Sequence, residues 1–184
     1  GPKGETRMMS ELINLAVFPG TQGGPLQHVI AAKAVAFFEI LQPGFESYTR
    51  QVISNARALA AAFNKRDYQI VSGGTDNHLL LIDLRNKGIS GKKAENTLVK
   101  AHITINKNMV PYDDKSPFVT SGIRLGVPAL TTRGLQETHM EQVADWIDKI
   151  LMQPDNDILI YEIQNQIKDF MSNFPLYPDW KTDL

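Results

Sequence analysis

The clearest pattern along the chain is an amphipathic stretch over residues 45–65. Its apolar residues recur at spacings of three and four, which places them on one side of a helix. They are Phe45, Tyr48, Val52, Ala56, Leu59, Ala60 and Phe63. The opposite side carries Arg50, Asn55, Arg57 and Lys65. The pattern therefore predicts a helix with one buried side and one solvent-facing side.

A second helix is predicted just before it, over residues 26–41, and it differs in character. It is rich in alanine and apolar on nearly all sides, so we expect it to be covered by other protein. The preceding segment, residues 18–25, is dense in glycine and proline, and Pro25 suits a first helical turn. The pair Pro43-Gly44 is expected to end this helix.

Beyond residue 67 the period of the pattern changes from helical to alternating. Residues 68–72 and 78–84 read as two strands, joined by a Gly-rich turn into a hairpin. Two further short strands are expected at 103–106 and 121–125.

Three helices are predicted to accompany these strands. Ser90 is a suitable N-cap for a helix that continues to about Ala101, and Thr132 is the expected cap of the next. Pro154 ends that helix, and a last helix follows over residues 158–170. The tail, residues 174–180, is irregular and is expected to dock through its aromatic side chains.

Strands covered by helices predict a small α/β domain, in the wider sense that includes α+β, at the carboxyl end. We expect three parts: residues 1–44 as the end of a larger domain, 45–67 as a long connecting helix, and 68–184 as the small domain. Residues 1–12 look unanchored, which predicts an upstream part of the protein.

Composition narrows the functional classes. The 184 residues carry a formal net charge of −1, which gives no general reason to expect nucleic acid as a partner. No apolar run reaches the ~18 residues of a membrane span, and the absence of cysteine excludes disulfides and thiolate chemistry. The histidines show no metal-ligand spacing, so no metal site is predicted. A cytoplasmic protein is the default expectation.

Three segments could carry chemistry. Gly23 and Gly24 precede a helix, where free N–H groups can bind an anion such as phosphate, although a tight loop needing glycine explains them more simply. Asn106-Lys107-Asn108 follows a predicted strand, where carboxamides can read a heterocycle or merely stabilise a loop. Both alternatives stay open from the pattern alone.

Arg124 is the third, because it stands inside an apolar strand between glycines. An arginine in such a place needs a partner, and its planar guanidinium suits a carboxylate. A carboxylate ligand and an internal Asp or Glu are about equally good candidates for that partner.

Four segments in this order resemble the serine hydroxymethyltransferase family, over nearly the whole chain. They are residues 17–25 (VFPGTQGGP), 71–78 (VSGGTDNH), 106–108 (NKN) and 116–124 (SPFVTSGIR). The resemblance implies the carboxyl-terminal part of an aspartate-aminotransferase-like enzyme (fold type I). Such an enzyme uses pyridoxal 5'-phosphate, converts serine to glycine and passes the one-carbon unit to tetrahydrofolate.

The resemblance also implies roles for matching positions. Arg124 falls on the family's arginine for the substrate carboxylate. Gly23 and Gly24 fall on a loop that reaches the cofactor phosphate of the neighbouring subunit, which implies a homodimer or a dimer of dimers. The folate contacts implied are Asn108, Ser116, Pro117 and Phe118. Asp76 and His78 belong to a family segment but receive no role.

The departures from the family pattern are as informative. No Thr-Thr-His-Lys segment with the Schiff-base lysine occurs, so no catalytic residue is assigned to this chain. Val127 stands where the family's Gly-Thr-Pro pattern has threonine. We therefore expect a piece of the transferase that is inactive without an amino-terminal part of the same protein. The alternatives are a non-catalytic module that binds folate or a partner, and, less favoured, an aminotransferase.

Overall fold

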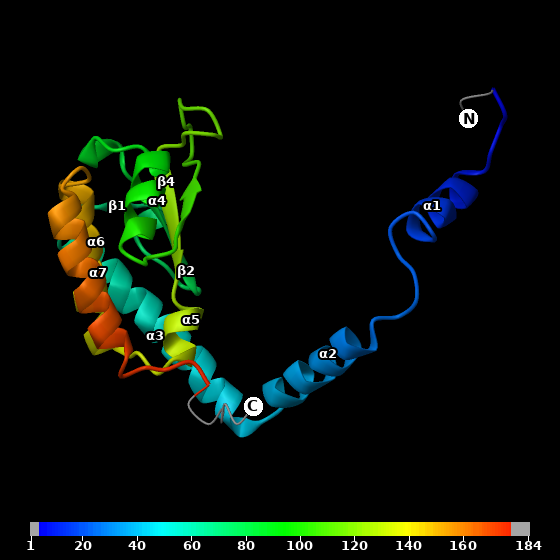
Figure 1. Ribbon diagram of the computed structural model, residues 1–184, viewed down its shortest axis with the longest axis horizontal. Helices are drawn as coiled ribbons and strands as arrows, with labels where there is room; N and C mark the ends of the chain where they lie inside the picture. The colour runs from blue at the N-terminus through cyan, green and yellow to red at the C-terminus, as the bar shows by residue number, and fades with distance from the viewer. Residues whose placement is uncertain (1–3, 178–184) are drawn as a thin grey trace. The chain divides into compact units, whose positions relative to one another are not determined.

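The computed structural model describes residues 4–177, which fall into two compact units that divide after Phe45. Unit 1 contains two helices and unit 2 a sheet with its helices (Figure 1). The helices are α1 (Met9–Val17), α2 (Gln27–Ile40), α3 (Pro43–Asn64), α4 (Gly91–Lys100), α5 (Pro128–Thr132), α6 (Glu137–Met152) and α7 (Asp157–Met171). The strands are β1 (Gln69–Ile70), β2 (Leu79–Asp83), β3 (Asn106–Asn108) and β4 (Gly122–Gly126). None of the helices within residues 4–177 has the length and apolarity needed to cross a membrane.

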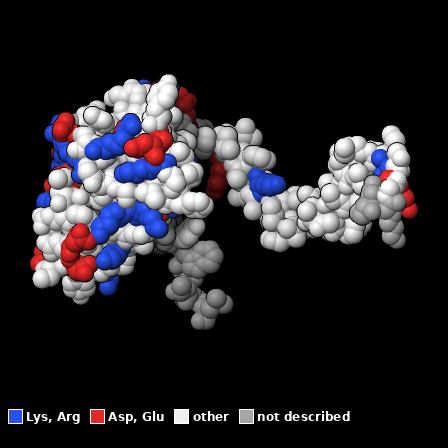
Figure 2. Space-filling model, turned by 90° about the horizontal axis from the view of Figure 1, so that it is seen from above, with Lys and Arg blue, Asp and Glu red and all other residues white. Residues whose placement is uncertain are grey.

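Unit 1 exposes nearly all of its apolar side chains. Helix α2 confirms the prediction for residues 26–41, whereas α1 was not predicted. Neither helix has a buried residue, and Phe37 and Phe38 are each 65% exposed. Charged side chains are sparse on this part of the surface (Figure 2). An apolar surface of this extent is typical of a segment that is covered by further protein.

The pair Pro43-Gly44 follows the end of the second helix, as expected, and Pro43 also begins the next one. Helix α2 already ends at Ile40, and Pro43 is the first residue of α3. Proline is well tolerated there because the first helical N–H groups have no intrahelical acceptor.

Unit 2 is built on a four-stranded antiparallel sheet in the order β1-β2-β4-β3. The predicted hairpin is present, but β1 is shorter than expected because a 3-10 turn over Val71–Gly73 ends it. Ser72 has a φ of 65° in this turn, which a strand does not tolerate. The strand expected at 103–106 was placed too early, since β3 begins only at Asn106.

One face of this sheet is covered by helices, and the other is covered only at its Gly122 end, where the Val110 side chain lies against the strand. Leu80 and Ile82 of β2 and Ile123 and Leu125 of β4 are buried, and they alternate with less buried residues. Alternating side chains point to opposite faces. Helices α4, α6 and α7 all lie on one side of β2 and β4 (Figure 1). The small α/β architecture expected from the sequence is therefore observed, with a single layer of sheet that keeps one open face.

The apolar side of α3 is buried as predicted, but the polar side is not wholly exposed. Asn55, expected on the solvent-facing side, is 0% exposed. Its amide Nδ2 donates to Thr131 Oγ1 and to the backbone carbonyl of Leu135, each at 2.9 Å. A buried carboxamide with its hydrogen bonds satisfied is compatible with a core. Asn55 therefore joins α3 to the segment between α5 and α6.

Helix ends follow local chemistry in most cases. Ser90 caps α4 as predicted, because its hydroxyl accepts from Lys93 N at 3.2 Å. The cap expected at Thr132 was wrong, since Thr132 is the last residue of α5. Helix α6 begins at Glu137, where Gln136 and His139 form a reciprocal capping box.

The segment after α7 packs back onto the domain. The Arg133 guanidinium donates to the carbonyls of Phe174 (2.6 Å) and Met171 (3.1 Å). The Phe174 ring lies 5.1 Å from that of His139. Docking of the tail through aromatics is therefore confirmed at Phe174, whereas Trp180 lies outside the described residues.

Basic and acidic side chains are mixed on the drawn face of unit 2 (Figure 2). Among the ion pairs of this unit, Arg66 meets Glu141 at 2.8 Å and Lys149 meets Asp145 at 2.7 Å. Exposed pairs of this kind contribute at most about 1 kcal/mol each. The buried core, rather than these pairs, holds the domain together.

Candidate functional site

Arg124 lies in the middle of β4 and points to the open face of the sheet. Its neighbours Ile123 and Leu125 are buried on the helix side, and the alternation of a strand then directs Arg124 away from the core. The side chain is exposed, in contrast to the burial that an apolar strand suggested. Gly122 and Gly126, two residues away on either side, add no side chain to the same face.

The residues beside Arg124 on this face follow from the strand register. Leu81 of β2 and Asn106 of β3 are its direct partners across the sheet. Directly opposed residues of antiparallel strands project from the same face. The Arg124 side chain is therefore flanked by the aliphatic side chain of Leu81 and the neutral carboxamide of Asn106.

No internal acid pairs with Arg124 among residues 4–177. The nearby acid of β2, Asp83, is bound by Arg85 through a fork whose shortest contact is 2.6 Å. Burial would raise the pKa of Asp83, but its hydrogen bonds with Arg85 outweigh this and lower it. Within the described residues no Asp or Glu pairs with Arg124, and its exposed guanidinium needs no internal partner, so a carboxylate ligand stays a prediction.

A structured loop, residues 109–121, connects β3 to β4 and is organised by Asp113. This carboxylate accepts from the N–H of Val110 (3.2 Å), Lys115 (3.0 Å) and Ser121 (2.8 Å), and from the Ser121 hydroxyl (2.7 Å). Burial opposes the charge, but these hydrogen bonds hold the pKa of Asp113 well below its usual range. The loop is therefore organised around a carboxylate that is charged at neutral pH.

The end of this loop is also fixed to α4. The N–H of Gly91 donates to Thr120 O at 3.0 Å, and the N–H of Lys92 donates to Val119 O at 2.9 Å. A Cβ on Gly91 would collide with Thr120 Oγ1 and with the backbone carbonyl of Gly122. Position 91 therefore accepts only glycine, because the end of the loop passes directly against the start of α4 there.

The four positions implied for folate are gathered in and beside this loop. Asn108 ends β3 on the same face as Arg124, and it is half-buried with its Nδ2 bonded to Met109 O at 2.7 Å. Ser116, Pro117 and Phe118 are exposed on the loop, with the Phe118 ring 80% accessible. An exposed aromatic ring and a carboxamide are the kinds of group that bind a flat heterocycle.

Gly23 and Gly24 lie in unit 1, in the loop that leads to α2. An added Cβ at either position would meet nothing within 4 Å, and neither N–H donates to another group of the described residues. Helix α2 begins at Gln27, two residues later than Pro25, which places both glycines outside the helix. Their backbone is thus accessible to an anion, but as a loop rather than as a first helical turn.

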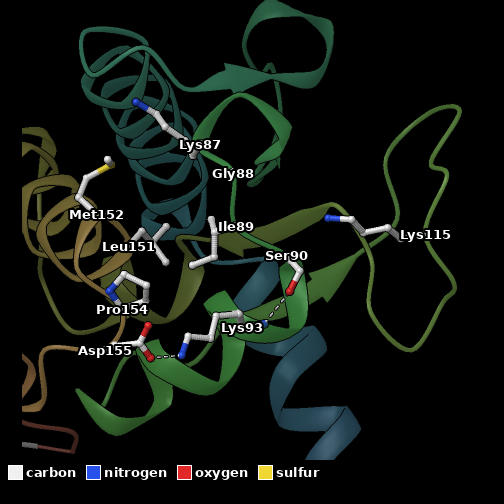
Figure 3. Close-up of a pocket in the computed structure, with 10 residues that line it drawn as sticks. All are labelled: Lys87, Gly88, Ile89, Ser90, Lys93, Lys115, Leu151, Met152, Pro154 and Asp155. Atoms are coloured by element: carbon white, nitrogen blue, oxygen red, sulfur yellow. Dashed lines mark hydrogen bonds and ion pairs between the residues drawn. The ribbon is translucent and has the colours of Figure 1, made fainter.

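A hollow of about 500 Å³ lies elsewhere, at the start of α4 (Figure 3). Its basic side chains largely have partners: Lys93 pairs with Asp155, and Lys87 donates to Arg66 O at 2.7 Å. None of the residues implied for the substrate, cofactor or folate lines it. The open sheet face, and not this hollow, is the candidate site.

Sequence reasoning missed two supports of the site. Asp113 stands in a Pro-rich loop, where an aspartate often organises a turn, and this signal could have identified it. The need for Gly91 arises from a crossing of distant segments that no local pattern shows. Val127, at the position where the resemblance predicts threonine, provides no side-chain cap for α5. Residues 4–177 contain no cluster of ligands able to hold a metal ion.

Comparison with known proteins identifies the family of the chain. The family model for serine hydroxymethyltransferase matches residues 2–147. A curated serine hydroxymethyltransferase from Dichelobacter nodosus (strain VCS1703A) is 54% identical over 165 residues, which are 90% of this chain and 40% of that protein. The chain thus spans about two fifths of the length of the relative that it matches. We conclude that the chain belongs to the serine hydroxymethyltransferase family.

Proposed function

We propose that the complete protein is a serine hydroxymethyltransferase with pyridoxal 5'-phosphate as cofactor. It transfers the hydroxymethyl group of serine reversibly to tetrahydrofolate, giving glycine and 5,10-methylenetetrahydrofolate. Membership of the family and the chemistry of the open sheet face support this proposal.

The observation that carries the proposal is the exposed Arg124 without an internal acid. A guanidinium binds a carboxylate through two parallel hydrogen bonds, which fixes the direction of the bound group as well as its position. In this proposal Arg124 binds the carboxylate of serine or glycine and orients the amino acid. A carboxylate held in this way fixes the axis from the carboxylate to the α-carbon, and rotation about that axis is set by the other contacts of the amino acid.

The cofactor fits the accessible backbone of Gly23 and Gly24. Their N–H groups are free to donate to a phosphate within the described part of the chain, and the absence of side chains permits close approach. When bound, pyridoxal 5'-phosphate supplies an electron sink for the negative charge that develops at the α-carbon of the amino acid. We assign the two glycines to the phosphate of a neighbouring subunit, in a homodimer or a dimer of dimers.

The folate co-substrate is assigned to the loop that Asp113 organises. Phe118 provides a ring against which a flat heterocycle can stack. The Oδ1 of Asn108 accepts no hydrogen bond within residues 4–177, so it can accept one from an N–H group of the heterocycle. Ser116 and Pro117 shape the same surface. Because the loop is fixed at both ends, little conformational entropy is lost when the ligand binds.

The 184-residue chain alone is expected to be inactive. Its sequence holds no Thr-Thr-His-Lys segment to supply the Schiff-base lysine. We propose that an amino-terminal part of the same protein supplies it, covers α1 and α2, and completes a fold type I enzyme in the cytoplasm. The exposed apolar side chains of both helices support this proposal.

The test uses the full-length protein loaded with pyridoxal 5'-phosphate. We expect conversion of L-serine to glycine that requires tetrahydrofolate. Arg124→Lys removes the planar fork but keeps the charge, and we expect it to raise the KM for serine at least about tenfold, since about 1.4 kcal/mol corresponds to a factor of ten. The KM for tetrahydrofolate should change little.

The matched control is Arg57→Lys, the same substitution at an exposed position of α3, which should leave both KM values unchanged. Conversion of serine without tetrahydrofolate, or amino transfer to a keto acid, would contradict the proposed activity. A serine KM that is equal in Arg124→Lys and in the unmodified enzyme would contradict the role of Arg124.

A further inference from the structure

Asn106 is placed next to Arg124 by the register of the sheet. The two residues are direct Cα partners across β3 and β4, so their side chains leave the same face with Cβ atoms about 4.5–5.5 Å apart. Asn106 is exposed, and its carboxamide makes no hydrogen bond within the described residues. An unpaired carboxamide therefore stands within reach of whatever the guanidinium binds.

The opposite orientation of the next residue confirms the direction of Asn106. Lys107 turns to the helix side, where its Nζ lies 3.1 Å from Glu95 Oε2 of α4. Its backbone N–H donates to Oε1 of the same carboxylate at 2.9 Å. Strand β3 is thus held against α4 by Lys107, which leaves the Asn106 side chain free of this structural task.

The neutrality of Asn106 is as relevant as its hydrogen-bonding groups. An aspartate has the same shape, but beside Arg124 it would form an ion pair, as Asp83 at the end of β2 does with Arg85 of the following turn at 2.6 Å. Such a pair would neutralise the guanidinium that the substrate carboxylate requires. A carboxamide offers N–H donors to a carboxylate without competing for the arginine.

We infer that Asn106 is a second residue of the amino-acid carboxylate site and a determinant of its specificity. Its N–H group donates to the carboxylate that Arg124 binds, and its lack of charge leaves the guanidinium available to that carboxylate. The inference rests on the proposed function, because the carboxylate is that of serine or glycine.

The experiment compares Asn106→Ala and Asn106→Asp in the full-length enzyme loaded with its cofactor. Removing a hydrogen bond to a charged group typically changes binding about tenfold or more, so Asn106→Ala should raise the KM for serine by about that factor. Asn106→Asp should raise it further, to about a hundredfold, because the new carboxylate occupies Arg124. The dissociation constant of glycine, measured by calorimetry, should follow the same order, while the KM for tetrahydrofolate stays within about twofold.

Lys107→Ala is the control on the same strand and the opposite face. It breaks the contact with Glu95 and should lower the unfolding temperature without changing the KM for serine. A serine KM unchanged in Asn106→Ala, or an aspartate variant no worse than the alanine variant, would overturn the inference. If the unmodified enzyme converts serine in a tetrahydrofolate-dependent way, such a result refutes only the role of Asn106; if it does not, the proposed function itself fails.

Discussion

Asn55 provides the sharpest test of how unit 2 is held together. It is fully buried on α3, and its amide bonds both Thr131 and the Leu135 carbonyl, while its Oδ1 accepts from Gln51 at 2.9 Å. We consider its replacement by alanine. The substitution keeps the helix, since alanine has the highest helix propensity, and so removes only the side-chain contacts.

The expected cost follows from what each former partner can do afterwards. Thr131 Oγ1 still donates to Val127 O at 2.9 Å, and Gln51 still donates to Glu137 at 2.8 Å. The Leu135 carbonyl, in contrast, accepts no other hydrogen bond among the described residues. One buried carbonyl without a donor costs about 1–3 kcal/mol, and the small cavity adds to this. We therefore expect a loss of about 3 kcal/mol in the free energy of unfolding.

The assay is thermal unfolding of the chain followed by circular dichroism. For a domain of this size about 3 kcal/mol corresponds to a decrease of about 6–12 °C in the unfolding temperature. Asn64→Ala is the matched control, because Asn64 is exposed on the same helix, and its effect should be small. A decrease below about 2 °C for Asn55→Ala would refute the reasoning, because the bonds to Leu135 and Thr131 would then contribute nothing.

Two further outcomes follow from the loop and from the end of α7. Asp113→Asn places an NH2 group against N–H donors, so at pH 7 it should destabilise the chain by about 2 kcal/mol in urea unfolding. Because the pKa of Asp113 is lowered by folding, its contribution is fully present above its ordinary pKa of 3.8 and is lost as the pH falls below it. The difference between the two proteins should therefore shrink at pH 3, and a constant difference would contradict the role of the charge. Arg133→Met keeps the aliphatic stem but loses the bonds to Met171 O and Phe174 O, and limited proteolysis should then cleave after α7 faster; an unchanged cleavage rate would show that these bonds do not hold the tail.

Local patterns were sufficient for most of the fold. The three-and-four spacing in α3, the Ser90 cap of α4 and the alternation in β2 all act over a few residues, and these elements were predicted nearly where they occur. Where the predicted ends of elements were wrong, contacts made by other residues decided the outcome. Thr132 looks like a cap by its type, but contacts of Gln136 with His139 place the true start of α6 four residues later.

The sequence was sufficient to name candidate residues for the site, but it did not show how they are arranged in space. Arg124 is conspicuous in sequence because it interrupts an apolar strand, yet the pattern could not tell an internal acid from a ligand. Asp83 is paired by Arg85, two residues along the chain, whereas the pairing of Glu95 with Lys107 depends on how β3 packs against α4. The burial of Asn55 was hidden for the same reason, because its hydrogen-bond partners are distant in sequence.

The register of β4 couples correct folding to a correctly aimed arginine. Side chains alternate along a strand, so a shift of one residue would turn Arg124 into the apolar core and bring Ile123 and Leu125 into water. Such a shifted sheet would expose two large aliphatic side chains and bury an unpaired charge, and both changes oppose folding. A molecule that has formed this sheet has therefore also directed Arg124 away from the core, so folding itself excludes a stable domain with the arginine on the wrong face.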